Sequence, residues 1–148
     1  MAWDSHIVVA CVVERDGKFL LVEERIEGAT VLNQPAGHWD PGETLFEAAL
    51  RETLEESAWE VRLDALLGLY HYQPPQLDYG FLRVAFAATA LRHHAGRALD
   101  DGIERALWMS RDELAACPQR HRSPMVLACV DDWLAGRRQP LDLVRHLR

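Results

Sequence analysis

The sequence has little of what several protein classes require. It contains only three cysteines, Cys11, Cys117 and Cys129, which lie far apart and form no C-x-x-C pair. This set supports neither a disulfide framework nor a structural zinc site. The longest apolar run, residues 7–13, is far shorter than the roughly 20 residues of a membrane-spanning helix, and no charged leader with a cleavage site precedes it. We therefore expect a cytoplasmic protein with no membrane partner.

Positive charge is also scarce. The chain has 16 basic and 23 acidic side chains, a formal net charge of −7, and Lys18 is its one lysine. Proteins that hold nucleic acids by their phosphates normally carry net positive charge, so we expect no nucleic acid polymer as a partner. The 148 residues are 49% hydrophobic, enough for one well-buried core. We expect a single domain over residues 1–148, as a monomer or homodimer.

Local patterns along the chain predict both strands and helices. The predicted strands are residues 7–13, 18–24, 65–72, 80–91 and 105–109. The first is apolar throughout, as in a strand buried on both faces, and a turn at Asp16-Gly17 joins it to the second. Residues 28–42, rich in Gly, Pro and Asn, are expected to form a loop.

Three helices are predicted from their start signals. Thr44 and Ser110 each precede a Glu by three residues, which is the capping-box pattern, and the first of these helices should run to about residue 57. Ser123 should cap a third helix, with Pro124 at its first position and Gly136 as its stop. Strands interleaved with helices, together with antiparallel hairpin pairs, predict an α/β fold with a mixed sheet.

The most informative segment is residues 37–59, which carry six acidic side chains and one basic side chain. At 100° per residue, Glu52, Glu55 and Glu56 share one helix face within an arc of about 100°. Such a face is most often simply solvated. However, Mg²⁺ binds carboxylate oxygens together with substrate phosphates, and Gly37 could bring a backbone carbonyl close to the same ion. The spacing alone leaves both interpretations open.

The same segment resembles the Nudix box, the signature of the Nudix family of hydrolases. The matching positions, separated by five, seven and two residues, are Gly37, Glu43, Arg51-Glu52 and Glu55-Glu56. Nudix proteins are α/β/α sandwiches that hydrolyse a nucleoside or other diphosphate linked to a further moiety, usually with Mg²⁺. The resemblance implies this fold, with a mixed sheet, and a small-molecule phosphoanhydride as substrate.

The resemblance also implies roles for residues of the box. Glu52, Glu55 and Glu56 would be catalytic metal ligands, and the Gly37 carbonyl would be a further ligand. The expected ion is Mg²⁺, with Mn²⁺ as a possible substitute. These ions could bridge phosphate oxygens and lower the pKa of a bound water.

Two other box residues would support the site, and the end of the box departs from the family pattern. Glu43 and Arg51 would pair to hold the loop and the helix in register. The final glycine of the box is Ala58 here, followed by Trp59. Glycine there usually ends the helix in a left-handed conformation, which costs alanine roughly 1–2 kcal/mol. We therefore expect the helix end to differ from that of the family.

The resemblance extends beyond the box to a group of bacterial Nudix phosphatases. It runs through residues 9–13, 17–24, 33–38, 81–83, 122–124 and 140–141. It implies release of orthophosphate from nucleoside tri- and diphosphates and from thiamine or hydroxymethylpyrimidine pyrophosphate. The alternatives within the fold are an ADP-ribose pyrophosphatase and a sanitiser of oxidised nucleotides. A ligand-sensing module without turnover is an alternative of another class, although such modules usually lack box glutamates.

The general base of such a reaction is open. Family members often supply an acid just before the strand that leads to Trp108, where this chain has Asp100, Asp101 and Glu104. We favour Glu104 as the catalytic acid or base, although any of the three could be an ordinary surface acid.

Candidate substrate-binding residues are Arg83, Trp39 and Arg25. Arg83 interrupts an apolar strand, where a cation needs a partner, either a substrate phosphate or an internal salt bridge. Arg25 is a weaker candidate for binding phosphate. Trp39 could stack on a base, as could four further aromatic residues, for all of which a place in the core or at the rim is the simpler explanation: Trp3, Tyr70, Tyr72 and Tyr79. His38 is of interest only because it follows Gly37.

Overall fold

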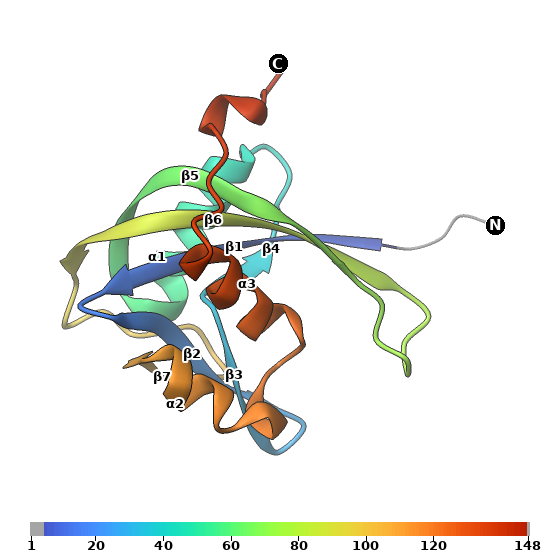
Figure 1. The fold of residues 1–148 in the computed structure, drawn as a ribbon, viewed down its shortest axis with the longest axis vertical. Helices are drawn as coiled ribbons and strands as arrows, with labels where there is room; N and C mark the ends of the chain where they lie inside the picture. The colour runs from blue at the N-terminus through green and yellow to red at the C-terminus, as the bar shows by residue number, and fades with distance from the viewer. Residues whose placement is uncertain (1–4, 148) are drawn as a thin grey trace.

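In the computed structural model, which describes residues 5–147, seven strands form one mixed sheet (Figure 1). The strands are β1 (Ser5–Arg15), β2 (Lys18–Ile26), β3 (Ala29–Asn33), β4 (Ala36–His38), β5 (Trp59–Tyr72), β6 (Gly80–His93) and β7 (Ile103–Met109). The main order is β3-β2-β1-β6-β5, while β4 pairs with β1 and β7 with β2. Only the β1–β6 pair is parallel among these pairings, so the predicted mixed sheet is confirmed.

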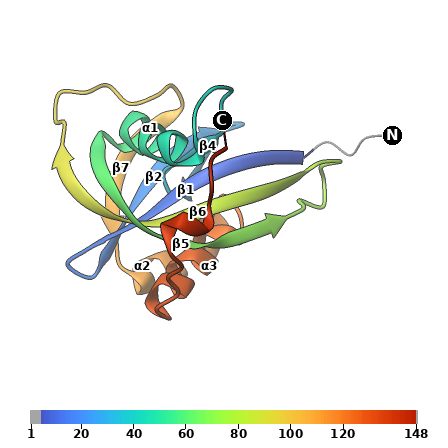
Figure 2. The ribbon, with the colours of Figure 1, turned by 90° about the horizontal axis from the view of Figure 1, so that it is seen from above.

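Helices cover both faces of the sheet. Helix α1 (Leu45–Ser57) lies on one face, and α2 (Arg111–Ala115) and α3 (Met125–Leu134) lie on the other (Figure 2). Short 3-10 turns occupy Pro118–Arg120 and Leu141–Leu143. This arrangement is the predicted α/β/α sandwich. Within residues 5–147, no helix is long and apolar enough to cross a membrane.

Strand β1 lies at the centre and separates two apolar cores. Val9 and Cys11 pack in a cluster with the alanines of α1, whereas Val12 packs in a second cluster with residues of α2 and α3. Alternate side chains of one strand project to opposite faces, so a strand buried on both faces needs a continuous apolar run. The turn after β1 places both Asp16 and Gly17 at positive φ, as its sequence predicts.

Residues 28–42 are not one loop, contrary to our prediction. Strand β3 pairs with β2 across a tight turn at Glu27 and Gly28, both at positive φ, and β4 pairs with β1. These strands are only five and three residues long, and their partners supply the hydrogen bonds that a local pattern does not reveal. Strand β5 also begins earlier than predicted, because its pairing with β6 continues back to Trp59.

The ends of the helices follow their sequence signals with two differences. Thr44 and Glu47 form the predicted capping box at the start of α1. Helix α3 begins at Met125, one residue after the predicted first position, and the Met125 N–H donates to the Ser123 hydroxyl at 3.1 Å. Our expectation of a different end for α1 is wrong: Ala58 adopts the left-handed conformation itself, with φ 62°, and its N–H donates to the Leu54 carbonyl at 2.9 Å.

Candidate active site

A cavity of about 440 Å³ is lined by residues from several elements of the fold. Glu52 and Glu56 of α1 and Glu24 of β2 give it acidic side chains. Arg83 of β6 and Arg122, just before α3, give it basic side chains. The fold thus brings carboxylates and guanidinium groups from distant parts of the sequence to one cavity.

Glu56 is the most buried acid of this cavity, with 9% of its surface exposed. Its carboxylate accepts a hydrogen bond from the Ala36 N–H at 2.9 Å. Burial, reinforced by the nearby charge of Glu52, raises the pKa of Glu56 to about 8. Burial likewise raises the pKa of Glu52. Both carboxylates therefore lie where a cation would stabilise their ionised forms.

Gly37 of β4 allows Glu52 to approach the strand closely. A Cβ atom at position 37 would overlap the Glu52 carboxylate. A larger residue would force this helix away from the strand or displace the side chain. A glycine is therefore needed at this position of the box for a steric reason, which the spacing of the motif alone does not show.

Arg51 joins the loop before α1 to the helix face. Its Nε and Nη2 donate to the two Glu43 oxygens at 3.0 and 2.6 Å, so the expected pair is present. Its Nη1 donates to Glu52 at 2.8 Å and to Glu55 at 3.1 Å, and Nη2 also reaches the His38 carbonyl at 3.1 Å. One guanidinium group therefore crosslinks the loop and two of the three box glutamates.

The donor atoms suit a hard divalent cation. Glu52, Glu55 and Glu56 offer carboxylate oxygens, and Glu56 is buried without a cationic partner in the part of the chain that the structure describes. In the present arrangement, no three Asp, Glu, His or Cys side chains of residues 5–147 converge closely enough to hold a metal. Glu52 and Glu55 would have to turn from Arg51 toward the ion.

Arg83 is the basic counterpart of Glu56, with only 2% of its surface exposed. Its Nη1 donates to Gln34 Oε1 at 2.7 Å, its Nη2 donates to Asn33 Oδ1 at 2.8 Å, and its Nε has no partner. Within residues 5–147, no carboxylate lies within ion-pairing distance of this guanidinium. The internal salt bridge that we considered for Arg83 is therefore absent there.

Among the residues predicted to be catalytic, metal-binding or substrate-binding, four do not line the cavity: Glu55, Glu104, Arg25 and Trp39. Arg25 and Glu104 form an ion pair with each other at 2.6 Å, and both are exposed. Arg25 follows Glu24 in β2, so their side chains project to opposite faces, and it is Glu24 that lines the cavity. This placement gives no support to our choice of Glu104 as a catalytic group or of Arg25 as a phosphate ligand.

Asp100 does not line the cavity either, but, in addition to burial, its charge raises the pKa of both Glu52 and Glu56. Its N–H donates to the Glu55 backbone carbonyl at 3.0 Å. Partial desolvation and the charge of Glu55 raise the pKa of the Asp100 carboxyl. Among the three acids considered as a base, Asp100 is thus the one held against α1.

The aromatic candidates also differ in whether they line the cavity. Trp39 is 45% exposed, donates from Nε1 to the Glu43 carbonyl at 2.6 Å, and does not line the cavity. Tyr72 does line it, together with Phe81 and His38. Tyr70 and Tyr79 do not line the cavity: the Tyr70 hydroxyl donates to Asp132, and Tyr79 stacks on His6. Trp3 falls outside the described residues.

Several polar residues at or beside the cavity were given no site role from the sequence, among them Glu24, Asn33, Gln34 and Arg122. For Asn33 and Gln34, the sequence carries only a weak signal. They are two polar residues between an apolar strand and a proline. Arg122 was noted only within the segment 122–124 that shares the resemblance to the bacterial phosphatases. Their importance depends on contacts that no local pattern contains.

Comparisons with known proteins agree with this geometry. The NUDIX domain profile matches residues 4–129. The chain is 36% identical over 139 residues to Phosphatase NudJ of Escherichia coli (strain K12), covering 94% of this chain and 90% of that protein, and equally to the Shigella flexneri protein of that name. A NUDIX hydrolase from Nitrosomonas europaea is similar in structure, with a TM-score of 0.94 and 41% identity over 97% of this chain and 98% of that chain. The chain therefore belongs to the Nudix family, whose members hydrolyse phosphorus-containing anhydrides.

Proposed function

We propose that this Nudix hydrolase is a metal-dependent phosphatase. It would release orthophosphate from nucleoside tri- and diphosphates and from thiamine or hydroxymethylpyrimidine pyrophosphate. The similarity to Phosphatase NudJ over most of both chains supports this choice within the family. One observation carries the proposal. Two buried side chains of opposite charge, Glu56 and Arg83, line the same cavity, and each is held by its own hydrogen-bond partners.

The acidic side of the cavity is the proposed metal site. Glu52, Glu55 and Glu56, with the Gly37 carbonyl, would hold Mg²⁺, and Mn²⁺ could substitute. The bound ion would neutralise phosphate charge and make a bound water more acidic. Glu43 and Arg51 would keep the loop and helix in place, a role supported by their paired hydrogen bonds.

The chain's own residues would perform the remaining tasks. Arg83 and Arg122 would bind phosphate oxygens by charge-assisted hydrogen bonds. We favour Asp100 over Glu104 as the group that accepts a proton from the attacking water, because Asp100 is held against α1 and its pKa is raised. Tyr72 and Phe81 would contact the organic part of the substrate.

A substrate panel with separate detection of orthophosphate and pyrophosphate tests this function. The panel contains thiamine pyrophosphate, nucleoside di- and triphosphates, and ADP-ribose. Orthophosphate from the pyrophosphate and nucleotide substrates is the expected product. Pyrophosphate from triphosphates, or cleavage of ADP-ribose alone, would instead assign the chain to the diphosphatases of this fold.

A further inference from the structure

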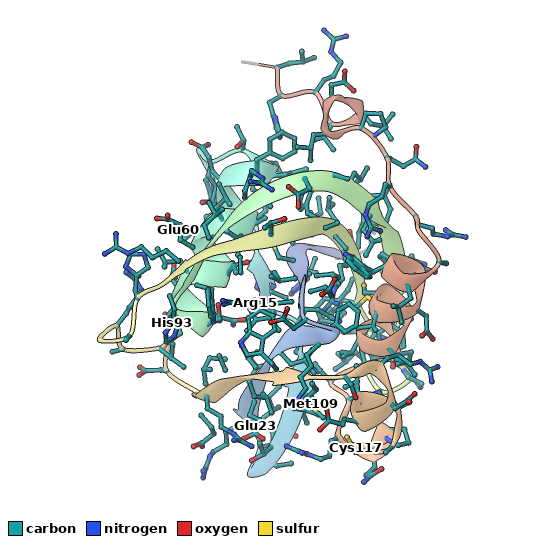
Figure 3. All side chains as sticks on the ribbon, turned by 60° about the vertical axis from the view of Figure 1, so that its left-hand side comes forward. Arg15, Glu23, Glu60, His93, Met109 and Cys117 are labelled. Carbon is teal, nitrogen blue, oxygen red and sulfur yellow. The ribbon has the colours of Figure 1, made fainter. Side chains whose placement is uncertain are left out.

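Arg83 differs from the other arginines of residues 5–147 that hydrogen-bond or ion-pair with side chains, because those arginines contact carboxylates. Glu23, labelled in Figure 3, illustrates the common arrangement, because it accepts hydrogen bonds from both Arg105 and Arg120 at 2.9–3.0 Å. Further arginines within 4.0 Å of a carboxylate are Arg25, Arg51, Arg62, Arg111 and Arg137. Arg83 is the one buried arginine of residues 5–147, yet both its oxygen partners are neutral amides.

The two amides are themselves held in place. Gln34 is 1% exposed, and its Nε2 donates to the Val126 carbonyl in the first turn of α3 at 2.7 Å. Because the NH2 group of the Gln34 amide donates to this carbonyl, the amide oxygen Oε1 is the atom that faces Arg83. Asn33 is fixed at the end of β3, where it pairs with Val22 of β2. The guanidinium is therefore oriented by groups anchored to α3 and to the sheet.

Neutral and charged partners have different consequences for a buried guanidinium. A carboxylate would orient the group but also cancel its charge, and an incoming phosphate would have to compete with it. An amide oxygen orients the group by a hydrogen bond and leaves its full charge uncompensated. A buried charge without a counter-ion is costly, and an anionic ligand can remove that cost.

We propose that Asn33 and Gln34 are positioning residues that hold Arg83 ready, without neutralising it, for a phosphoryl group. This phosphoryl group would be the terminal phosphate of the substrate and, after hydrolysis, the orthophosphate product. This inference rests on the proposed function for its choice of ligand. The amides act through Arg83 and take no part in the chemical step.

Asn33→Asp is the sharpest test, since it replaces one NH2 group by oxygen and places a carboxylate against Arg83. The expected result is an unchanged or higher thermal midpoint, because a buried ion pair is formed. The KM for a pyrophosphate substrate should rise about tenfold with kcat changed less than about threefold. A purely structural role predicts no such split between stability and KM.

Gln34→Glu provides a second variant, with Gln119→Glu as the matched control. Gln119 is exposed, and its side chain forms none of the side-chain hydrogen bonds of residues 5–147, so its variant adds the same charge without contacting Arg83. Gln34→Glu should raise KM as Asn33→Asp does, but with a lower thermal midpoint, because the donor to the Val126 carbonyl is lost. Gln119→Glu should leave KM within about twofold of the unmodified protein.

Calorimetric titration of inorganic phosphate into each protein with excess Mg²⁺ gives a readout independent of turnover. Asn33→Asp should weaken phosphate binding about tenfold. Unchanged KM and phosphate affinity in both Asn33→Asp and Gln34→Glu would overturn the inference even if orthophosphate is released. Weakened phosphate binding with no orthophosphate release from any substrate would uphold it and reject the proposed function instead.

Discussion

Glu56 and Arg83 are both buried, line the same cavity and carry opposite charges, yet they have different surroundings. Glu56 is placed by a long helix next to two further glutamates, and its hydrogen-bond donor is a backbone N–H. Arg83 is placed by a strand and held by two side-chain amides. Glu56 thus lies among like charges of its own helix, whereas Arg83 is held by neutral partners.

This difference indicates two ways of keeping a charge available. Burial, reinforced by like-charged neighbours, raises the pKa of Glu56, and a bound cation would relieve that cost. Neutral amides leave Arg83 without a counter-ion until an anion arrives. If Glu56 and Arg83 paired with each other, Glu56 would no longer attract a cation and Arg83 would no longer attract an anion. Keeping them separate suits a ligand that brings a cation and a phosphate together.

Metal removal should have the largest effect, because it acts on the acidic side alone. After treatment with a chelator, phosphate release should fall to background, and added Mg²⁺ or Mn²⁺ should restore it. Product assays before and after exhaustive metal removal measure the effect. Full activity in the metal-free protein would contradict the proposed role of the carboxylates.

Glu56→Gln should lower kcat by about 100-fold or more, since it removes one carboxylate ligand while keeping the shape of the side chain. Steady-state assays at saturating Mg²⁺ measure this. The matched control is Glu60→Gln, an exposed glutamate near the start of β5, which should retain full activity. Unchanged Mg²⁺-dependent phosphate release in Glu56→Gln would reject its assignment as a ligand.

Arg83→Met tests the basic side and should lower kcat/KM by about 10- to 100-fold, mainly through KM. The fold should tolerate the change, because the lost charge has no carboxylate partner among the described residues. Circular dichroism and steady-state kinetics report the two effects. Arg92→Met, at an exposed position of β6, is the control. A folded Arg83→Met protein with unaltered KM would remove Arg83 from substrate binding.

Ala58→Gly should have the smallest effect and acts on the scaffold of the acidic side only. Glycine adopts the left-handed conformation without the strain of a Cβ atom, so stability should rise by about 1 kcal/mol and the thermal midpoint by about 2–4 °C. The kcat should not change. Ala95→Gly, in a turn without positive φ, should give no such gain. A lower midpoint for Ala58→Gly would contradict this account of the helix end.

The acidic side was largely predictable from sequence. Capping, helix periodicity and the spacing of Glu52, Glu55 and Glu56 are all properties of one continuous segment. The short strands β3 and β4 were missed because their stability comes from pairing with β2 and β1. The end of α1 was predicted wrongly because Ala58, which is 3% exposed, adopts the conformation expected of glycine.

The basic side was predictable only as an isolated cation in an apolar strand. The partners of Arg83 lie 49 and 50 residues away, and Gln34 is anchored to a carbonyl 92 residues further along the chain. The choice between Asp100 and Glu104 could not be made from sequence for a similar reason. It depends on a backbone hydrogen bond from Asp100 to α1 and on the pairing of Glu104 with Arg25.

The central claim is that this cavity releases a terminal phosphate by using both charged sides. The most direct measurement is the product formed from thiamine pyrophosphate and from a nucleoside triphosphate by the unmodified protein with Mg²⁺, resolved by ³¹P NMR. The account predicts orthophosphate as the first phosphorus product from both substrates. Pyrophosphate from the triphosphate, or no cleavage of either compound, would contradict it.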